Sequence, residues 1–294
     1  MVAKVGEGDI VKHAATPPQP GTGQLFAESV RNGPVLSGTV RRVRLPPGRK
    51  LVALTFDLCE APHETAGYQG EIVDILRAHG IKATFFLVGK WMMTHQARAQ
   101  QLMSDGRFEV GNHTFAHHNL RLLSGAAAKE EISSTDQVYR RLREQLAARK
   151  CIPPAQPGYA DETTPGSMGL FRFPYGACNP QSLAAVSELG LIPIQWDVSS
   201  DDPDYRQPPD AMTRMVLDNV RPGSIVLFHA NGRGWYTDDA LPGIISGLQE
   251  RGYQFVTVTE LLKAGDPVIS PSCYDRTDGD TDRYDDLARQ LEEQ

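Results

Sequence analysis

The stretch Phe108-Glu109-Val110-Gly111-Asn112-His113-Thr114-Phe115-Ala116-His117 joins a short apolar run to a pair of histidines. Its first five residues predict a buried strand, and the two imidazoles follow where that strand ends. Side chains four residues apart can reach one point if the residues between them form a helical turn. Paired imidazoles are common ligands of divalent metals. Taken alone, the pair could equally be two polar side chains of a surface loop.

Short apolar runs alternate with helical patterns on both sides of this stretch. The runs predict strands at residues 51–56, 83–88, 108–112, 170–173, 191–196, 224–229 and 254–258. Amphipathic spacing predicts helices at 68–79, 96–103, 124–150, 181–189, 210–220, 240–251 and, as a last turn, 259–263. Strands that are apolar throughout suit a parallel sheet covered on both faces. The chain is therefore expected to be α/β, either a closed barrel or a doubly wound open sheet. No Gly-x-Gly-x-x-Gly follows a strand, which removes the main nucleotide-binding version of the open sheet.

The 294 residues divide into three segments by composition. Residues 1–48 are rich in proline and glycine and predict an extended arm. Residues 49–265 carry the alternating pattern. Residues 266–294 read as a charged, solvated tail that ends in a short helix. Four aspartates of this tail are spaced loosely like a calcium loop, but their register is wrong for an EF-hand.

Overall composition limits the partners. The net charge is −6, which gives no indication of a nucleic-acid partner or an anionic membrane. No run of 18 apolar residues predicts a membrane span, and the first 15 residues lack the apolar core of a signal peptide. The protein is expected to be either cytoplasmic or a mature form whose leader has been removed.

Ionisable residues follow most of the predicted strands. Asp57, Arg172 and His229 each end one strand, and Trp196-Asp197 is followed by Asp201 and Asp202. Each has a structural explanation, such as a helix cap, a surface ion pair or a hydrogen-bonded core histidine. In α/β barrels, however, the carboxyl ends of the strands form the rim where active sites are built. Ionisable residues at several strand ends together indicate such a site.

These residues carry a resemblance to a known family. Thr55-Phe56-Asp57, His113 to His117, Arg172-Phe173-Pro174-Tyr175-Gly176 and Leu227-Phe228-His229 resemble, in order and spacing, the motifs of the polysaccharide deacetylases. This is the NodB-homology group, or carbohydrate esterase family four. The resemblance covers about residues 50–263 and implies an irregular (β/α)7 barrel. It also implies a hydrolase that removes N- or O-acetyl groups from polysaccharides with a divalent metal, often zinc.

The resemblance assigns roles to the groups that would act on water and metal. Asp57 would be the general base, and Arg172 would orient it through an ion pair. His113 and His117 would hold the metal.

Further roles concern the sugar and the leaving group. His229 would be the general acid, and Asp202 would pair with it. Tyr175 would donate its backbone N–H to the oxyanion. Trp196 and Trp235 are candidates for contacting the sugar. The loop that carries Trp235 is rich in glycine, and a packed loop with a buried tryptophan is the alternative.

Two departures from the family pattern concern the metal and the acidic motif. Leu58 stands where the family usually has an aspartate that is the third metal ligand, and Pro203 stands where it usually has a tryptophan. Two histidines alone would hold a metal weakly. Another ligand is therefore sought in the same loop, from the set Asp57, Glu60, His63 and Glu64.

The four cysteines are compatible, by number alone, with two disulfides or with four reduced thiols. In the family framework Cys59 and Cys178 lie in two loops on the same rim. A Cys59–Cys178 disulfide is therefore expected, leaving Cys151 to pair with Cys273. Such a bridge would favour export to the periplasm or the cell exterior.

The leading hypothesis is a hydrolase that deacetylates an N-acetylated, or possibly O-acetylated, sugar of a polysaccharide or oligosaccharide. Leu58 motivates a second hypothesis, a metal-free hydrolase of small cyclic amides similar to the allantoinases. A third is a non-catalytic glycan-binding protein, against which the presence of Asp57, Arg172 and His229 together argues. The sequence does not fix the sugar, the acetyl position, the metal or the oligomeric state.

Overall fold

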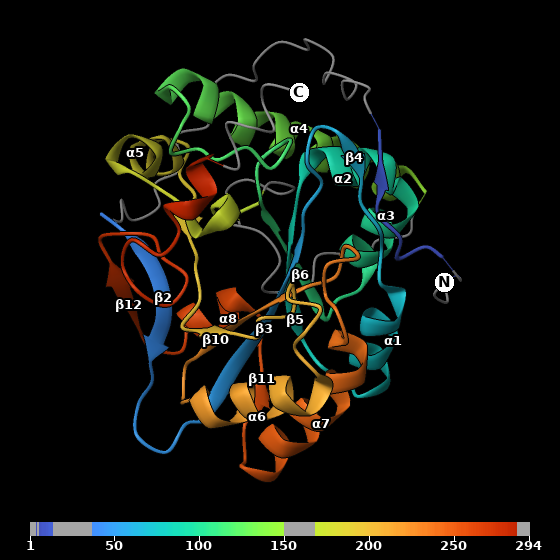
Figure 1. The fold of residues 1–294 in the computed structure, drawn as a ribbon, viewed down its shortest axis with the longest axis vertical. Helices are drawn as coiled ribbons and strands as arrows, with labels where there is room; N and C mark the ends of the chain where they lie inside the picture. The colour runs from blue at the N-terminus through green and yellow to red at the C-terminus, as the bar shows by residue number, and fades with distance from the viewer. Residues whose placement is uncertain (1–3, 5, 14–36, 150–167, 287–294) are drawn as a thin grey trace.

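The computed structural model describes residues 4, 6–13, 37–149 and 168–286 (Figure 1). Its centre is a curved sheet with the strand order β8-β7-β6-β5-β3-β10-β9. Each neighbouring pair in this order is parallel. The strands are β3 (Leu51–Leu58), β5 (Ala83–Leu87), β6 (Phe108–Asn112), β7 (Leu170–Phe171), β8 (Ile192–Pro193), β9 (Val198–Ser199) and β10 (Ile225–His229). The predicted α/β fold with a NodB-type barrel is confirmed as a half-barrel of parallel strands with helices outside it.

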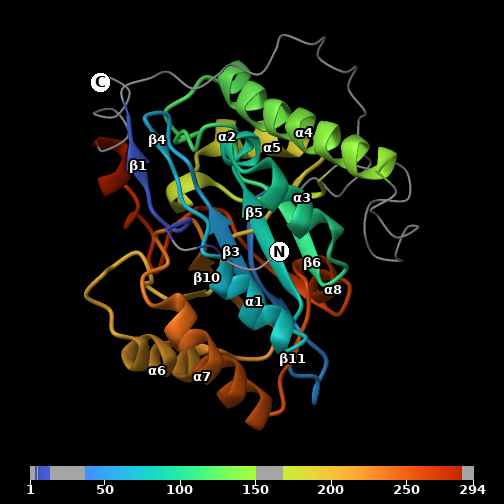
Figure 2. The ribbon, with the colours of Figure 1, turned by 90° about the vertical axis from the view of Figure 1, so that its right-hand side faces the viewer.

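Helices cover the outer face of this sheet (Figure 2). They are α1 (Gly70–Ala78), α2 (Gly89–Thr94), α3 (Gln96–Ser104), α4 (Gly125–Ala148), α5 (Pro180–Glu188), α6 (Pro209–Asn219) and α7 (Thr237–Glu250). The short helix α8 (Val258–Leu262) instead packs against the core inside the barrel through Val258 and Leu261. The neighbours α6 and α7 pack on each other at one end of the molecule, and α4 packs against α2, α3 and α5 at the other. None of the described helices is long and apolar enough to cross a bilayer. The loop predicted at 151–168 lies outside the described residues, apart from Met168.

The central strand β3 is buried along its whole length. Side chains alternate across a strand, and here both faces are covered. Val52, Leu54, Phe56 and Leu58 belong to the core between sheet and helices, whereas Leu51 and Ala53 belong to the core inside the barrel. The alternation places the side chain of Asp57 on the inner face. A strand buried on both faces explains why its sequence is apolar throughout.

The two ends of the chain add strands outside the main sheet. Within the segment predicted as an arm, β1 (Val11–Lys12) pairs with β4 (Glu64–Thr65), and β2 (Thr39–Arg44) pairs antiparallel with β12. Strand β12 (Asp266–Ser270) belongs to the segment predicted as a tail. In addition, β11 (Gln254–Phe255) pairs with the start of β3. The segment boundaries at residues 48 and 265 remain a prediction.

Strand β2 contacts both sides of the opening of the half-barrel, next to the end of β8 and the start of β10. Single bridges join Val40 to Ile194 and Arg42 to Ser224. The backbone approaches closely here, because Val43 donates its N–H to the Gly223 carbonyl at 2.9 Å. Gly223 has φ +88°, and a Cβ on it would lie 1.8 Å from the Val43 oxygen. Only glycine fits this contact.

Candidate active site at the carboxyl ends of the strands

A cavity of about 720 Å³ opens at the carboxyl ends of the parallel strands. It gathers most of the predicted site residues, although they come from strands that are far apart in the sequence. Its lining includes Asp57, His113, His117, Tyr175, Trp196 and His229. Arg172 and Asp202 lie fully buried behind these side chains. Trp235 is 48% exposed and is not among the lining residues, so its contact with a sugar remains a prediction.

Asp57 and Arg172 form a buried ion pair at the floor of the cavity. The Arg172 Nη1 donates to Asp57 Oδ1 at 2.7 Å, and its Nη2 donates to the Gln195 carbonyl at 3.3 Å. The guanidinium also lies over the Phe86 ring, 4.1 Å from the ring centroid. One carboxylate oxygen is thus fixed by the arginine. The other, Oδ2, lies 3.6 Å from His113 Nε2 and faces the site.

His229 lies beside Asp57, because β10 and β3 are parallel neighbours with these two residues in register. Its Nδ1 donates to Asp202 Oδ1 at 2.8 Å. Burial lowers the pKa of His229, but Asp202 more than compensates, and the pKa is raised well above its ordinary value. Asp202 therefore favours the protonated ring and occupies its Nδ1, so Nε2–H is the proton that faces a bound molecule.

Asp202 is itself fixed by two further donors that the sequence analysis did not identify. Its Oδ2 accepts from the His229 backbone N–H at 2.6 Å and from the Thr237 hydroxyl at 2.8 Å. Thr237 is the first residue of α7 and follows Tyr236, which has a left-handed backbone with φ 58°. Sequence periodicity does not predict the Thr237–Asp202 hydrogen bond, because this contact depends on the path of one loop.

Cys59, His113 and His117 form a compact cluster next to Asp57. One ligand atom from each side chain lies within 4.8 Å of the others. The Arg172 carbonyl accepts from His113 Nδ1 at 2.8 Å, which fixes the tautomer and leaves Nε2 with its lone pair toward the cluster. Cys59 Sγ lies 3.6 Å from that Nε2. The ring of His117 packs edge-on against those of His113 and Tyr175.

The electrostatics of this cluster favour the thiolate form of Cys59. Burial alone would raise the pKa of the Cys59 thiol, but His117 and His113 lower it well below its usual range. Burial likewise lowers the pKa of His113, but Asp57 and Cys59 raise it overall. The two imidazoles thus favour the thiolate form of Cys59, which is the form of cysteine that binds metals. A nitrogen, nitrogen and sulfur donor set of this kind suits a divalent metal such as zinc.

Two of the carboxylates predicted as possible extra ligands already bind other groups. Glu60 accepts from the Ala66 N–H at 2.9 Å and from the Thr94 hydroxyl at 2.9 Å, and its pKa is raised by burial. Glu64 pairs with Arg233 at 2.8 Å. His63 lines the cavity. Asp57 lies at the cluster itself, with its Oδ2 3.6 Å from His113 Nε2. The sequence does not indicate Cys59 as a ligand, because the family resemblance places it in a disulfide, whereas the structure places its thiol at the cluster.

Comparisons with known proteins agree with this geometry. The family model described as polysaccharide deacetylase matches residues 44–164. A chitooligosaccharide deacetylase of Azorhizobium caulinodans is 30% identical over 223 residues, which cover 71% of this chain and 93% of that protein. The chain belongs to the polysaccharide deacetylase family.

Two further relatives show the range of this deacetylase family. The peptidoglycan-N-acetylglucosamine deacetylase of Listeria monocytogenes is 31% identical over 256 residues, and the match spans 86% of this chain but only 47% of that protein. Among solved structures, an activity-restored mutant of a carbohydrate esterase family four pseudoenzyme from Bacillus anthracis has a TM-score of 0.62 and 28% identity. That match covers 77% of this chain and 72% of the other. Both active and inactive proteins thus share the fold.

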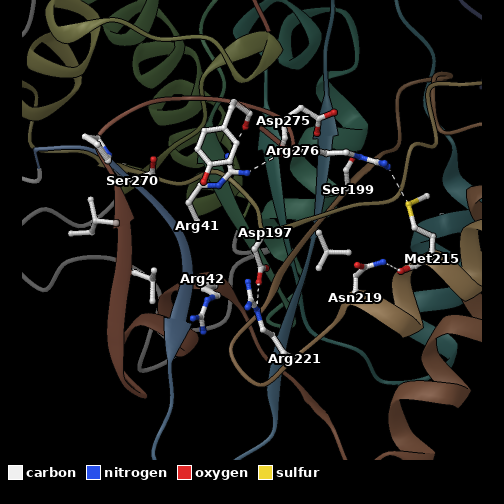
Figure 3. A pocket seen from close by; sticks show the side chains of 15 residues that line it. Arg41, Arg42, Asp197, Ser199, Met215, Asn219, Arg221, Ser270, Asp275 and Arg276 are labelled. Carbon is white, nitrogen blue, oxygen red and sulfur yellow. Dashed lines mark hydrogen bonds and ion pairs between the residues drawn. The ribbon is translucent and has the colours of Figure 1, made fainter. Parts of the chain in front are cut away.

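A second cavity of this deacetylase, about 550 Å³, lies between β2, α6 and the C-terminal segment (Figure 3). Several of its charged groups are already paired. Arg41 donates to the Tyr274 and Asp275 carbonyls, and Arg221 pairs with Asp197 at 3.3 Å. Asp197 was noted at a predicted strand end, and the structure places its carboxylate here, away from the histidine cluster.

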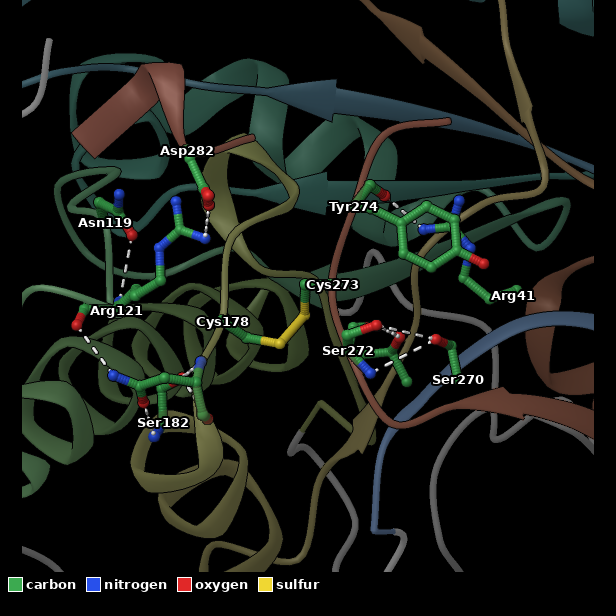
Figure 4. Close-up of a disulfide and its surroundings, with 12 residues drawn as sticks. Arg41, Asn119, Arg121, Cys178, Ser182, Ser270, Ser272, Cys273, Tyr274 and Asp282 are labelled. Carbon is green, nitrogen blue, oxygen red and sulfur yellow. Dashed lines mark hydrogen bonds and ion pairs between the residues drawn. A yellow bond between two sulfur atoms is a disulfide. The ribbon is translucent and has the colours of Figure 1, made fainter. Parts of the chain in front are cut away.

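The disulfide pairing differs from the prediction (Figure 4). Cys178 is bonded to Cys273, with their Cα atoms 5.4 Å apart and a sequence separation of 95. The predicted Cys59–Cys178 bond is wrong, because Cys59 is a free, buried thiol directed at His113. A Cys151–Cys273 bond is wrong too, since Cys273 already has its partner. Cys151 lies outside the described residues.

The described part of the predicted tail, residues 266–286, lies over the rim, and we call it the C-terminal segment. The end of the tail, where a short helix is predicted, lies largely outside the described residues. Tyr284 packs against Tyr175 with ring centroids 5.4 Å apart, and Asp275 accepts from Trp196 Nε1 at 2.9 Å. Arg121 holds the segment through Asp282 at 2.9 Å and Asp285 at 2.6 Å. The residues of this segment that line the cavity are Asp275, Arg276, Asp280, Arg283 and Tyr284.

Several loops of the site contain strained backbone. Left-handed φ values between 57° and 69° occur at five described non-glycine residues, namely Thr114, His117, Tyr175, Asp201 and Tyr236. All of them lie in loops that follow strands of the main sheet. Such residues each cost about 1–3 kcal/mol and concentrate at functional sites.

Proposed function

We propose that this protein removes acetyl groups from an N-acetylated sugar of a polysaccharide or oligosaccharide. One observation carries the proposal. A buried carboxylate fixed by an arginine and a protonated histidine fixed by an aspartate face one cavity from neighbouring strands, beside a cluster of metal-ligating atoms. Amide hydrolysis requires such a base, such an acid and a means of stabilising charge on the carbonyl oxygen.

The proposed reaction begins at Asp57. Its Oδ2 accepts a proton from a water molecule as the water oxygen attacks the acetyl carbon. Arg172 is a positioning residue that holds the other oxygen of the carboxylate. Tyr175 lines the cavity and has a left-handed backbone with φ 60°, and its N–H would donate to the developing oxyanion.

The reaction ends at His229. The C–N bond breaks as Nε2–H of the imidazolium gives its proton to the leaving nitrogen, which yields acetate and a free amine. Asp202 stabilises the imidazolium and fixes the ring. The neutral imidazole is then protonated again from solvent, and the carboxylic acid of Asp57 loses its proton.

His113 and His117 are the proposed metal-binding residues, and zinc is the proposed ion. When bound, the metal would supply Lewis acidity for the acetyl carbonyl. Asp57 would add an oxygen close to the same position, since its Oδ2 is 3.6 Å from His113 Nε2.

The relatives support a proposal for the substrate, and the disulfide supports one for the cellular location. We propose an N-acetylglucosamine polymer, because the relatives are named for chitooligosaccharide and for peptidoglycan N-acetylglucosamine. The sugar rings would contact Tyr175 and Trp196, and also Tyr284 from the C-terminal segment. Trp235 would be a more distant contact. The Cys178–Cys273 bond favours an oxidising compartment, the periplasm or the cell exterior.

The test is acetate release from chitooligosaccharides and from peptidoglycan by the zinc-loaded protein. We expect release by the wild type and a loss of at least about 100-fold in kcat/KM for Asp57→Asn and for His229→Gln. Asp218→Asn, an exposed position on α6, is the matched control and should keep full activity. No release from either substrate, or full activity in both site variants, would contradict the proposal.

Non-catalytic glycan binding is the second candidate. It is favoured by Leu58 at the usual ligand position and by the structural similarity to a pseudoenzyme. Oligosaccharide binding without acetate release, unchanged by Asp57→Asn, would establish this alternative. The two outcomes are mutually exclusive in the same set of variants.

A further inference from the structure

We propose that Cys59 is the third protein ligand of the metal, so that the site is built from two imidazoles and one thiolate. The inference rests on the proposed metal site of the deacetylase. It does not depend on the substrate or on the identity of the base and acid.

The side-chain directions at the end of β3 explain why residue 59, and not residue 58, would bind the metal. Leu58 is fully buried in the core between sheet and helices, with Leu54 and Phe56. Its side chain therefore points away from the cavity. Because side chains alternate across a strand, Asp57 points to the inner face, and Cys59, the first residue after β3, lines the same cavity with its Sγ 3.6 Å from His113 Nε2. The ligand missing at position 58 is supplied by the next residue along the chain.

The backbone of Cys59 is held in place. Asn231 Nδ2 donates to the Cys59 carbonyl oxygen at 2.7 Å, and Asn231 is itself fully buried. Cys59 is only 4% exposed, yet its sulfur lines the cavity. The His113 ring is fixed by the Arg172 carbonyl at the opposite nitrogen. Two of the three ligands are thus oriented before any metal binds.

The spacing of one pair of ligand atoms matches a tetrahedral site, and all three atoms lie within 4.8 Å of one another. Zinc binds sulfur at about 2.3 Å and imidazole nitrogen at about 2.05 Å, which at a tetrahedral angle places the two ligand atoms about 3.6 Å apart. The distance between Cys59 Sγ and His113 Nε2 is 3.6 Å. A site with three protein ligands leaves a fourth position for a substrate oxygen or water.

A thiolate also determines which metals bind. Thiolate and imidazole together suit Zn²⁺ and Co²⁺, whereas Mg²⁺ and Ca²⁺ prefer sets of oxygen ligands. We expect the protein to retain Zn²⁺ in the presence of a large excess of Mg²⁺. A carboxylate at the same place would make this discrimination weaker.

The test is a titration of the metal-free full chain with Co²⁺, followed by near-ultraviolet absorption. Cobalt bound to a thiolate has an intense charge-transfer band there, and cobalt bound only to nitrogen and oxygen does not. We expect the band to saturate at about one equivalent in the wild type. It should be absent from Cys59→Ala and Cys59→Ser, and zinc affinity should fall at least about 100-fold in both.

Cys151→Ser is the control, because Cys178 and Cys273 are in a disulfide and Cys151 is the remaining cysteine of the chain. It should keep the band. Cobalt binding without the band in the wild type, or no binding at all, would overturn the inference. So would a band that survives in Cys59→Ala and is lost in Cys151→Ser.

The readout separates the inference from the proposed function. A wild type that shows the band but releases no acetate would retain the ligand assignment and lose the deacetylase proposal. A wild type that releases acetate but lacks the band would do the reverse. The wild-type spectrum needs no variant, so a misfolded Cys59→Ala protein does not obscure the result.

Discussion

The proposed base and acid are each defined by one buried partner. Arg172 fixes Asp57, and Asp202 fixes His229, through contacts of 2.7 and 2.8 Å. The sequence predicted all four of these residues, because they end strands and match family motifs. It did not predict Thr237 or the direction of Cys59. Those depend on loop backbone and on the face of a strand, which residue type and spacing do not specify.

The His229–Asp202 pair predicts a pH dependence. The proposed acid would work in its protonated form. Burial lowers the pKa of His229, but Asp202 raises it well above its ordinary value. The kcat/KM of the zinc-loaded wild type should therefore persist into alkaline solution and fall only as pH rises through that pKa. In Asp202→Asn the charge is lost while burial remains, so the pKa falls and the alkaline limb moves to lower pH.

Measuring kcat/KM of both proteins between about pH 5 and pH 10 checks this prediction. The variant's loss of activity should be larger at about pH 8 than at about pH 6. Equal loss at every pH would mean that Asp202 orients the ring without setting its protonation.

At the scale of elements, the face of β3 decides what position 58 can hold. Restoring the family's usual residue with Leu58→Asp should not rebuild the family's site. It would place a carboxylate among Leu54, Phe56 and the helices instead. We expect a loss of more than about 3 kcal/mol in unfolding free energy, and no gain in zinc affinity.

Chemical denaturation and zinc titration of the same variant check this prediction. Leu58→Met is the matched control and should cost less than about 1.5 kcal/mol, since it keeps volume and polarity. A stable Leu58→Asp protein that binds zinc more tightly would show that residue 58 can turn toward the cavity.

The predictability of the elements also varied for physical reasons. Strands such as β3, β5, β6 and β10 were predicted to within about two residues, because each is apolar and bounded by turn residues. The pairing of β2 with β12 was not predicted. It joins residues more than 200 positions apart, and both lie in segments whose local composition indicated irregular structure. Register between distant segments leaves no local periodic signal.

At the scale of the whole molecule, the C-terminal segment is fastened to the rim. The disulfide, the Arg121 ion pairs and the β2–β12 ladder all hold it. Replacing both bonded cysteines, Cys178→Ser with Cys273→Ser, should lower the unfolding free energy by about 2–5 kcal/mol, because a long loop is no longer closed. The KM for oligosaccharides should rise more than kcat falls, since Asp275 and Tyr284 line the cavity.

Denaturation and steady-state kinetics of the double variant check both parts. Arg121→Gln is a useful comparison, because it loosens the same segment without touching the disulfide. An unchanged KM in both proteins would show that the segment covers the rim without contacting substrate.

The free thiol of Cys59 and the disulfide between Cys178 and Cys273 require opposite redox conditions during purification. A strong reductant keeps the thiol intact, but it opens the bond and competes for zinc. An oxidising buffer preserves the bond and exposes the thiol to damage. Cys59 is buried, so its thiol can persist beside the disulfide, since exchange between a thiol and a disulfide requires direct access. Purification with zinc present and without reductant should therefore preserve both forms of sulfur in one molecule.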